Sequence, residues 1–540
     1  MNVDWTQHLI VVPVLLPLVV GALMAPLTEG RHRIKFALSY ASALGLLANA
    51  VALMLLADDG WPGGIGVYFA ANWAAPFGIT LVADRLSSMM LVLTALMALA
   101  ALYYAQPRWS RIGVHFHTLF QLMLMGINGA FLTHDIFNLF VFFELMLATS
   151  YGLVLHGYNA ARLRASMQYI AVNLAAALLF LIGIALIYAT TGTLNMADLA
   201  KQAGSLSAPY IGLFRAGVAV MALAFLVKCA MWPLGFWLPT TYSVASPPVA
   251  VMLVLMTKVG AYVILRIWLL VFPDGAGAMA QFGYGALMWG GMATIVFGAA
   301  GMLATDTAGR MAGYAATVSS GTLLAVIGYG QPQVVTAGLY YFLASTIAIA
   351  AFVLLLELIE RMHAAPGAAL LALTMEAYAV EDSPAEPKGK GVPAATAFLS
   401  LAFAACALMI AGLPPLSGFV GKFGLFHALL NPGTSAPAIG AAGWTLMALV
   451  FTSGLAAIIS LMRFGVRTFW ASEFADPPRL HLAEVVPVAA LLVVSVLLTI
   501  KAEPMFAYLA RASADIHRPG LYVGRVLATP AVPGALKEVP

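Results

Sequence analysis

A long run of residues with a single charge constrains the fold of this chain more than any other feature. Of the 42 residues between Arg215 and Lys258, only Lys228 is an Asp, Glu, Lys, Arg or His. A lysine that faces lipid costs roughly 3 kcal/mol on insertion scales. We therefore expect Lys228 and Lys258 to face a protein interior, where such groups usually belong to an ion path or a proton relay.

The composition identifies the class of protein. The chain has 540 residues, of which 62% are hydrophobic and 9% charged, whereas soluble proteins carry roughly 25% charged residues. Its mean hydropathy is +0.94. We predict an all-α polytopic membrane protein whose residues 1–540 form a single transmembrane domain. The net charge of +4 then reflects membrane topology and gives no indication of nucleic-acid binding.

A spanning helix needs about 20 apolar residues, and on that basis the chain contains about fourteen spans. The first apolar run lacks a basic leader, which predicts a transmembrane helix and not a cleaved signal. The expected spans are 9–28, 36–57, 79–104, 114–133, 136–156, 165–190, 211–237, 247–272, 280–303, 310–329, 335–359, 393–430 (broken), 440–462 and 484–500.

The loop charges predict the orientation. Most basic loop residues follow odd-numbered spans, and basic residues favour the cytoplasmic side. We expect the chain to lie in the cell membrane (plasma or inner membrane). Both termini should then be on the external side, and the charged loop 361–392 on the cytoplasmic side. The C-terminal tail disagrees, because it carries Lys501, Arg511, Arg518 and Arg525. This conflict leaves two explanations, a wrongly assigned last span or a tail that packs on a partner.

Two spans contain prolines that should break the helix. The breaks are tolerated only where protein or a water cavity satisfies the freed backbone groups. Each broken span also carries a lysine, Lys228 or Lys422, which matches the inverted-repeat plan of transporters. We predict two inverted five-helix repeats, 114–272 and 280–462. The helix-breaking residues are Pro233, Pro239, Pro414 and Pro415.

Four buried charges are the candidate proton-transfer residues: Glu144, Lys228, Lys258 and Lys422. Glu144 is the only charge in the twenty residues of 136–155, and between Lys390 and Arg463 only Lys422 and His427 are Asp, Glu, Lys, Arg or His. Burial disfavours a charged form, and a nearby opposite charge favours it. A carboxylate beside Lys228 would thus control its proton, which Lys258 and Lys422 would pass on through water. The alternative is that these groups are structural ion pairs.

Other sites are weaker or absent. His134 and Asp135 lie in the short turn between spans four and five, either as a point where protons enter or as a solvated turn. The sequence has no Walker loop, Rossmann glycine signature or HExxH motif. The two cysteines, Cys229 and Cys406, are far apart and form no CxxC. No metal site and no cofactor is expected.

Three segments resemble a known family. They are FLTHDIFNLFVFFELMLATSYGLVLHG, AFLVKCAMWPLGFWLPTTYSVASPPVAVMLVLMTKVGAYVILR and IAGLPPLSGFVGKFGLF. They look like the antiporter-like subunits shared by respiratory complex I and the multisubunit monovalent cation/proton antiporters. Residues 68–90 and 191–200 are similar to the D-type subunit of the Mrp (Mnh, Pha) antiporters.

The resemblance implies fourteen helices with two inverted repeats, and a key ion pair between Glu144 and Lys228. Lys258 would be the central connecting lysine, and Lys422 would lie in the second broken helix. It also implies partner subunits of the A, B, C, E, F and G types, exchange of protons for Na⁺ or K⁺, and no redox cofactor.

The sequence departs from the family at two places. Ala344 stands where relatives often have histidine, and Ala348 where complex I relatives tend to have lysine. The missing lysine argues against a complex I subunit, and the missing histidine leaves a gap between Lys258 and Lys422 that water would have to bridge.

Three functions remain open from the sequence. The first is a subunit of a cation/proton antiporter. The second is a proton-pumping subunit of a complex I-like enzyme or membrane hydrogenase. The third is a scaffold subunit. Sodium prefers oxygen ligands, so a lysine-lined path favours proton movement in this chain and cation movement elsewhere.

Overall fold

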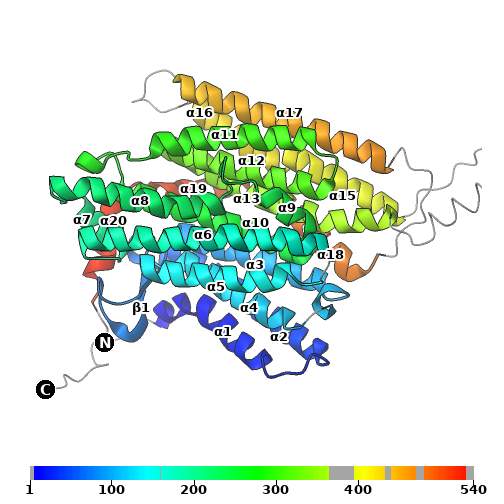
Figure 1. Ribbon diagram of the computed structural model, residues 1–540, viewed down its shortest axis with the longest axis horizontal. Coiled ribbons are helices and arrows are strands. Elements are labelled where there is room, and N and C mark those ends of the chain that lie inside the picture. Colours follow the sequence, from blue (N-terminus) through cyan, green and yellow to red (C-terminus); the bar gives the residue numbers. More distant parts are fainter. Residues whose placement is uncertain are drawn as a thin grey trace, which may run out of the picture.

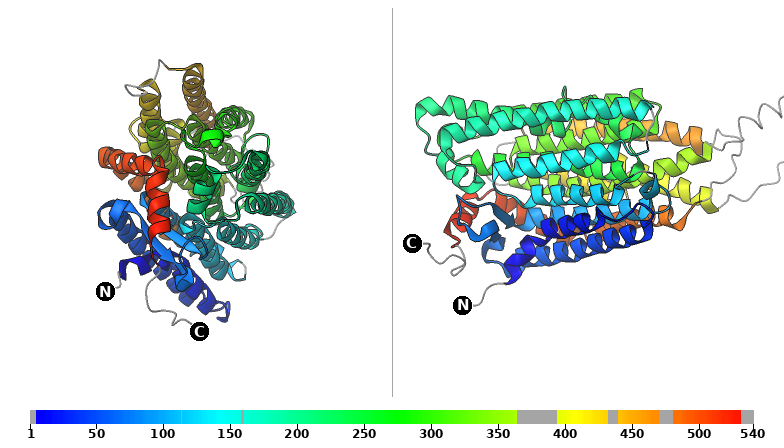
Figure 2. Two further views of the ribbon diagram at one scale, coloured as in Figure 1. Left: turned by 90° about the vertical axis from the view of Figure 1, so that its left-hand side faces the viewer. Right: turned by 60° about the horizontal axis from the view of Figure 1, so that its bottom comes forward.

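The computed structural model describes residues 5–112, 114–157, 160–363, 394–431, 439–469 and 480–530. Its helices run side by side in one bundle (Figures 1 and 2). They are α1 (Val12–Met24), α2 (His32–Leu55), α3 (Arg85–Ala105), α4 (Phe116–Leu132), α5 (Ile136–Val154), α6 (Ala160–Thr191), α7 (Met196–Ala203), α8 (Ala208–Lys228), α9 (Leu238–Val244), α10 (Pro247–Val271), α11 (Tyr284–Ala304), α12 (Ala308–Tyr329), α13 (Pro332–His363), α15 (Ala394–Ala411), α16 (Ser417–Leu430), α17 (Ala441–Phe469), α18 (Leu482–Ile500), α19 (Ala502–Ile516) and α20 (Pro519–Ala528).

Every predicted membrane span is present as an apolar helix, although two of these helices are short. Within the described ranges, 12 helical segments are long and apolar enough to cross a membrane, and α1 and α4 are shorter apolar helices. Each of the fourteen predicted spans therefore corresponds to one of these helices, and the chain is a helical multi-pass membrane protein. The strands β1 (Gly66–Phe69) and β2 (Thr80–Ala83) form an antiparallel hairpin in the connection before α3.

Two spans are interrupted in their middle. The first has α8 and α9 separated by the non-helical residues 229–237, and the second has α15 and α16 separated by 412–416. Pro233, Pro414 and Pro415 lie in these breaks, whereas Pro239 lies in the first turn of α9. Proline has no N–H group and cannot continue the helical ladder. At the end of α8 the carbonyl of Val227 accepts hydrogen bonds from the Ala230 N–H at 3.0 Å and from Trp237 Nε1 at 3.2 Å.

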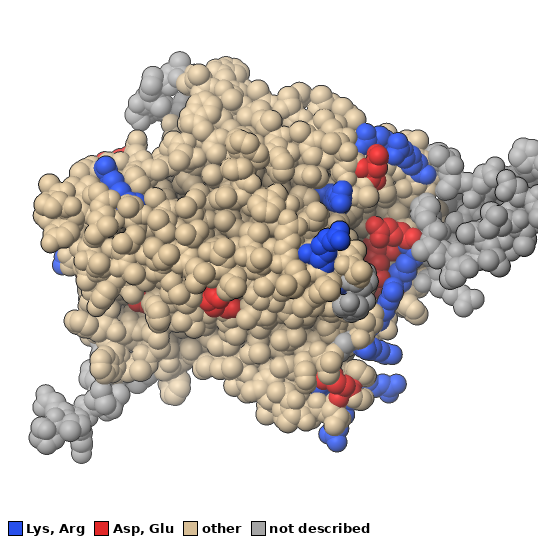
Figure 3. All heavy atoms as spheres, viewed as in Figure 1, with Lys and Arg blue, Asp and Glu red and all other residues tan. Residues whose placement is uncertain are grey.

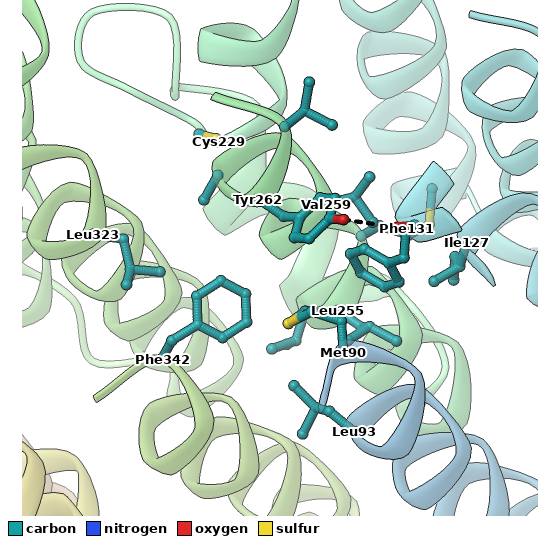
Figure 4. Close-up of a cluster of buried hydrophobic side chains, with 14 of the residues drawn as sticks. Met90, Leu93, Ile127, Phe131, Cys229, Leu255, Val259, Tyr262, Leu323 and Phe342 are labelled. Carbon is teal, nitrogen blue, oxygen red and sulfur yellow. Dashed lines mark hydrogen bonds between the residues drawn. The ribbon is translucent and has the colours of Figure 1, made fainter. Parts of the chain in front are cut away.

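The centre of the bundle is α10, in which every residue is buried. A helix that is apolar all round belongs in a protein interior and not at a surface. Figure 4 shows Tyr262 of α10 beside Phe131 of α4, with Leu93 of α3 and Phe342 of α13 on the other sides. The Tyr262 hydroxyl donates to the Phe131 carbonyl at 2.7 Å. Groups on α10 are therefore shielded from lipid.

The C-terminal helices correct the expectation for the basic tail. The last span is present as α18, and α19 packs on other helices of this chain. Arg511 pairs with Asp58 at 2.8 Å, and Arg85 pairs with Asp515 at 2.5 Å and with Asp58 at 3.0 Å. The first explanation offered from the sequence, a wrongly assigned last span, was therefore wrong, and packing of the tail on a partner stays a prediction.

The charged loop predicted at 361–392 lies almost wholly outside the described residues. Its first residue, Arg361, is described and pairs with Glu484 at 2.7 Å and with Glu357 at 3.2 Å. These pairs tie the end of α13 to the beginning of α18.

Candidate functional site

Lys228 is the last residue of α8 and is only 1% exposed. Its ammonium donates to the Tyr169 hydroxyl at 3.3 Å and to Asn173 Oδ1 at 3.4 Å, both on α6. The ring centroids of Phe143, Tyr169 and Trp237 lie 5.3–5.9 Å from its Nζ. Such rings attract a cation through their negative faces. The site therefore holds a cation with neutral groups.

Glu144 does not touch Lys228. Among the described residues no ion pair within 4.0 Å joins the two, because α5 presents the preceding residue, Phe143, to the lysine. Glu144 is partly buried, and its Oε1 atom has no hydrogen-bond partner in the described part of the chain. The expected ion pair is therefore not closed in this structure, and the carboxylate acts on Lys228 only from a distance.

Lys258 lies at the centre of α10 and is fully buried. Its ammonium donates to the hydroxyl of Ser319 on α12, and its Nζ lies 5.7 Å from the ring centroid of Phe342. The residues beside the two lysines are in contact, since Cys229 Sγ donates to the Thr257 carbonyl at 3.8 Å. The break after α8 thus places Lys228 next to the part of α10 that carries Lys258.

This close approach requires glycine at position 260. A Cβ atom there would lie 2.9 Å from Cys229 Sγ and 3.1 Å from the Phe225 carbonyl oxygen. Both distances are shorter than normal van der Waals contacts. Gly260 therefore permits α10 to pack directly against the break that follows Lys228.

A polar connection continues from Lys258 toward the second broken span. The hydroxyls of Ser319 and Ser345 lie 2.8 Å apart. Both line a cavity of about 20 Å³, which Ala348 and Lys422 line as well. About 10–15 Å³ of space is enough for one water molecule at a polar site. Two serine hydroxyls and a space large enough for a water molecule therefore lie between Lys258 and Lys422.

Lys422 interacts with the end of the first half of its broken span. Its ammonium donates to the carbonyls of Ala411 at 2.8 Å and of Ile410 at 3.3 Å. These carbonyls end α15, and a cation at a helix C-terminus is stabilised by the helix dipole. An ammonium has three donors, so two bonds to the backbone leave one N–H for the cavity.

His134 and Asp135 are not a solvated turn. His134 is fully buried, and its Nδ1 lies 3.0 Å from the Leu132 carbonyl oxygen. Burial and the nearby Arg266 lower the pKa of its imidazole to about 3. The Asp135 side chain accepts a hydrogen bond from the Asn138 backbone N–H at 2.8 Å and so caps α5, while burial raises its pKa.

The sequence analysis missed a buried ion pair on α10. Arg266 lies two helical turns beyond Lys258 and donates to Asp84 Oδ1 at 2.9 Å and to the Tyr262 hydroxyl at 3.1 Å. Burial opposes ionisation of Asp84, but the guanidinium outweighs it and holds the pKa of that carboxyl well below its usual range. The signal was visible, since Arg266 belongs to the same apolar stretch as the two lysines.

Comparison with known proteins places the chain. A sequence profile of the family described as NADH:quinone oxidoreductase/Mrp antiporter, transmembrane, matches residues 133–452. This region contains all four predicted proton-transfer residues. The chain belongs to this family.

Within the family, the chain is similar over its whole length to antiporter subunits of the D type. It is 50% identical over 533 residues, 98% of this chain and 99% of the relative, to a probable K⁺/H⁺ antiporter subunit of this type from Rhizobium meliloti (strain 1021). It is 31% identical over 530 residues, 96% and 99% of the two chains, to the D-type Na⁺/H⁺ antiporter subunit of Alkalihalophilus pseudofirmus.

The fold is also similar to a solved member of the family. A chain in the structure of the Mrp complex from Dietzia sp. DQ12-45-1b superposes with a TM-score of 0.81 at 26% identity, covering 97% of this chain and 100% of that one. The resemblance read from three sequence segments is therefore confirmed over almost the whole chain.

Proposed function

We propose that this chain is the proton-translocating subunit of a multisubunit Na⁺ or K⁺/H⁺ antiporter of the cell membrane. The proposal follows its similarity to D-type subunits named for K⁺/H⁺ and Na⁺/H⁺ exchange. The observation that carries it is the line of polar groups from Lys258 through Ser319 and Ser345 to Lys422. The partners would be subunits of the A, B, C, E, F and G types.

Protons would move between the lysines through hydroxyl groups. A serine hydroxyl both donates and accepts hydrogen bonds, so Ser319 can accept a proton from the Lys258 ammonium while it gives its own to Ser345. Water in the adjoining cavity of about 20 Å³ would carry the proton on to a neutral Lys422. Lysine suits this role because it loses its proton readily when buried, whereas arginine stays charged.

Glu144 would set the proton occupancy of Lys228. A carboxylate that approaches Lys228 stabilises the ammonium form, and one that withdraws favours proton release. The structure has the carboxylate out of contact and the ammonium held by Tyr169 and Asn173. We propose that transport alternates between this arrangement and one in which Glu144 pairs with Lys228.

We further propose that 114–272 and 280–462 are inverted repeats. Each half contains one broken span with one buried lysine, Lys228 at the end of α8 and Lys422 in α16. In each break the end of the first half-helix is close to a lysine, which is the arrangement expected at the ion-binding sites of transporters with broken helices.

The orientation rests on charge. Figure 3 shows most visible Lys and Arg side chains at the end opposite to α7, α20 and β1 of Figure 1. Basic residues favour the cytoplasm, so the end with α7, α20 and β1 would be external, together with both termini. His134 and Asp135 lie at that end, where we propose that protons enter through the buried polar groups around His134.

The cation would cross in another subunit. Four buried charges are assigned to the relay here, and three of them are ammonium groups that repel Na⁺ and K⁺. The alternative function is a proton pump driven by redox chemistry in a partner, and a scaffold role is the third reading.

Everted membrane vesicles from cells that make the whole complex distinguish these functions. A pH-gradient dye is followed while Na⁺, K⁺ or NADH is added. Collapse of the gradient on adding the cation, present in wild type and absent in Lys228→Ala at equal assembly, is the expected result. The exposed Lys201 supplies a matched control, Lys201→Ala. Pumping with NADH and no cation response would support the redox function, and full activity of Lys228→Ala would support the scaffold.

A further inference from the structure

A large apolar cavity lies away from the proposed relay. It has a volume of about 390 Å³ and is lined by residues of α2, α3, α13, α18 and α19. Small-molecule sites in proteins have volumes of roughly 300–1,000 Å³. Its lining is almost entirely apolar, and the charged residues in it are Asp58, Lys501 and Arg511. The cavity is therefore large enough for a ligand and has a charged end.

The apolar part of the cavity extends along the helix axes. On α3 the lining residues are Met89, Val92, Leu93 and Leu96, whose spacing places them on one face of the helix. At 1.5 Å per residue they cover about 10 Å of the helix. Because α3 is long and apolar enough to cross a membrane, this part of the cavity runs in the direction of lipid acyl chains.

The charged end lies where α18 meets α19. Lys501 separates these two helices and is exposed. Within the described part of the chain its ammonium has no hydrogen bond or ion pair. Arg511 binds Asp58 through two bonds of 2.8 and 3.0 Å while 48% of its side chain stays exposed. The exposed Glu503 is not part of the lining.

The charges of the lining residues and of their ion-pair partners do not cancel. Asp58 has two arginine partners, Arg511 and Arg85, and Arg85 also pairs with Asp515. Among the lining residues and their ion-pair partners, two carboxylates thus face two guanidinium groups, and the Lys501 ammonium is in excess; the exposed Asp59 and Glu503 are outside this set. An anionic group at this position would meet a free cation at the end of an apolar channel.

We propose that this cavity binds one anionic phospholipid of the surrounding bilayer. One acyl chain lies along α3, and the phosphate sits at Lys501 and the exposed edge of Arg511. A free phosphate would gain nothing from the apolar lining, and a neutral lipid would gain nothing from Lys501. The lipid lies against Leu343 and Ile347 of α13, the helix whose Ser345 and Ala348 line the cavity beside Lys422.

The test measures lipid retained by the purified complex. The assembled complex is delipidated in mild detergent, titrated with phosphatidylglycerol or phosphatidylethanolamine, and analysed by native mass spectrometry. We expect one retained phosphatidylglycerol per complex in wild type. Leu96→Trp should fill the apolar part and remove that molecule, whereas Leu223→Trp at an exposed leucine of α8 should retain it.

A second variant tests the charged end independently of any effect on folding. Lys501→Gln should lower the preference for phosphatidylglycerol over phosphatidylethanolamine by about fivefold, the contribution of one interfacial cation, and Lys201→Gln should leave it unchanged. Equal retention of both lipids by wild type, retention by Leu96→Trp equal to the control, or a partner-subunit helix found in the cavity of the assembled complex would overturn the proposal.

Discussion

Replacing Ser319 by alanine removes the hydroxyl that accepts a hydrogen bond from Lys258 and contacts Ser345 at 2.8 Å. Ser319 is 1% exposed, so the lost hydroxyl is not replaced by bulk solvent. If protons pass between Lys258 and the cavity beside Lys422 through this serine, the variant should assemble normally but translocate protons slowly.

The size of the effect follows from the bond that is lost. A hydrogen bond to a charged group contributes about 1.5–3 kcal/mol, and a factor of ten in an equilibrium corresponds to about 1.4 kcal/mol. The ammonium form of Lys258 should therefore become about 10- to 100-fold less favourable in its present position. We expect cation-dependent proton flux to fall by a similar factor.

The chain offers a matched control at the next position. Ser320 is equally buried on α12, but its hydroxyl has no hydrogen-bond partner among the residues that the structure describes, so Ser320→Ala should transport normally. Ser319→Thr keeps a hydroxyl and should retain most activity. The assay is dye-reported collapse of a pH gradient in everted vesicles with equal amounts of complex. Equal rates for Ser319→Ala and Ser320→Ala would refute the reasoning.

Three further predictions concern the surrounding structure. Asp84→Asn should lower the free energy of unfolding by about 3–5 kcal/mol, because it leaves Arg266 buried without its partner; thermal unfolding in detergent measures this, and an unchanged midpoint would contradict it. His134 has a folded-state pKa of about 3 against an ordinary 6.5, so the unfolded chain binds the extra proton. Stability should therefore fall by about 1.4 kcal/mol between pH 7.5 and 5.5, and His134→Asn should abolish that pH dependence; the same pH slope in both proteins would disprove it. Gly454→Ala should reduce proton flux, because the added Cβ would lie 2.6 Å from the Ala411 carbonyl oxygen that accepts from Lys422 and 3.1 Å from Lys422 Nζ itself; wild-type flux at equal assembly would argue against a fixed position for that ammonium.

The fold could be predicted from the sequence because a helix that crosses the hydrocarbon core of a membrane must be apolar and long enough to span it. Apolar length defined the spans, and each predicted span has its helix. Proline predicted the interruption near Pro233 and the one at Pro414 and Pro415, since these residues cannot continue a helical ladder. Pro239 was assigned to the break but lies in the first turn of α9, because proline is also favoured in the first turn of a helix.

The contacts of the buried charges could not be read in the same way. The neighbours of a buried side chain depend on how its helix is rotated about the helix axis. The rotation of α5 places Phe143, and not the next residue Glu144, beside Lys228. The gap between Lys258 and Lys422 that the missing histidine at Ala344 predicted contains a cavity lined by Ser345 and Ala348, and serine gives no signal in a hydropathy pattern. The ion pair between Arg511 and Asp58 could not be predicted either, because the two residues are more than 400 positions apart in the chain.

The central claim is that the buried lysines carry protons for antiport. The most direct measurement is cation-driven proton flux in proteoliposomes that contain the purified complex, with wild type, Lys258→Ala and Lys201→Ala compared at equal protein. Lys258 is fully buried and Lys201 is exposed. Comparing the two variants therefore distinguishes the loss of a relay lysine from the loss of a surface charge. Flux that is lost in Lys258→Ala and kept in Lys201→Ala is the predicted result, and equal flux in all three proteins would contradict the account.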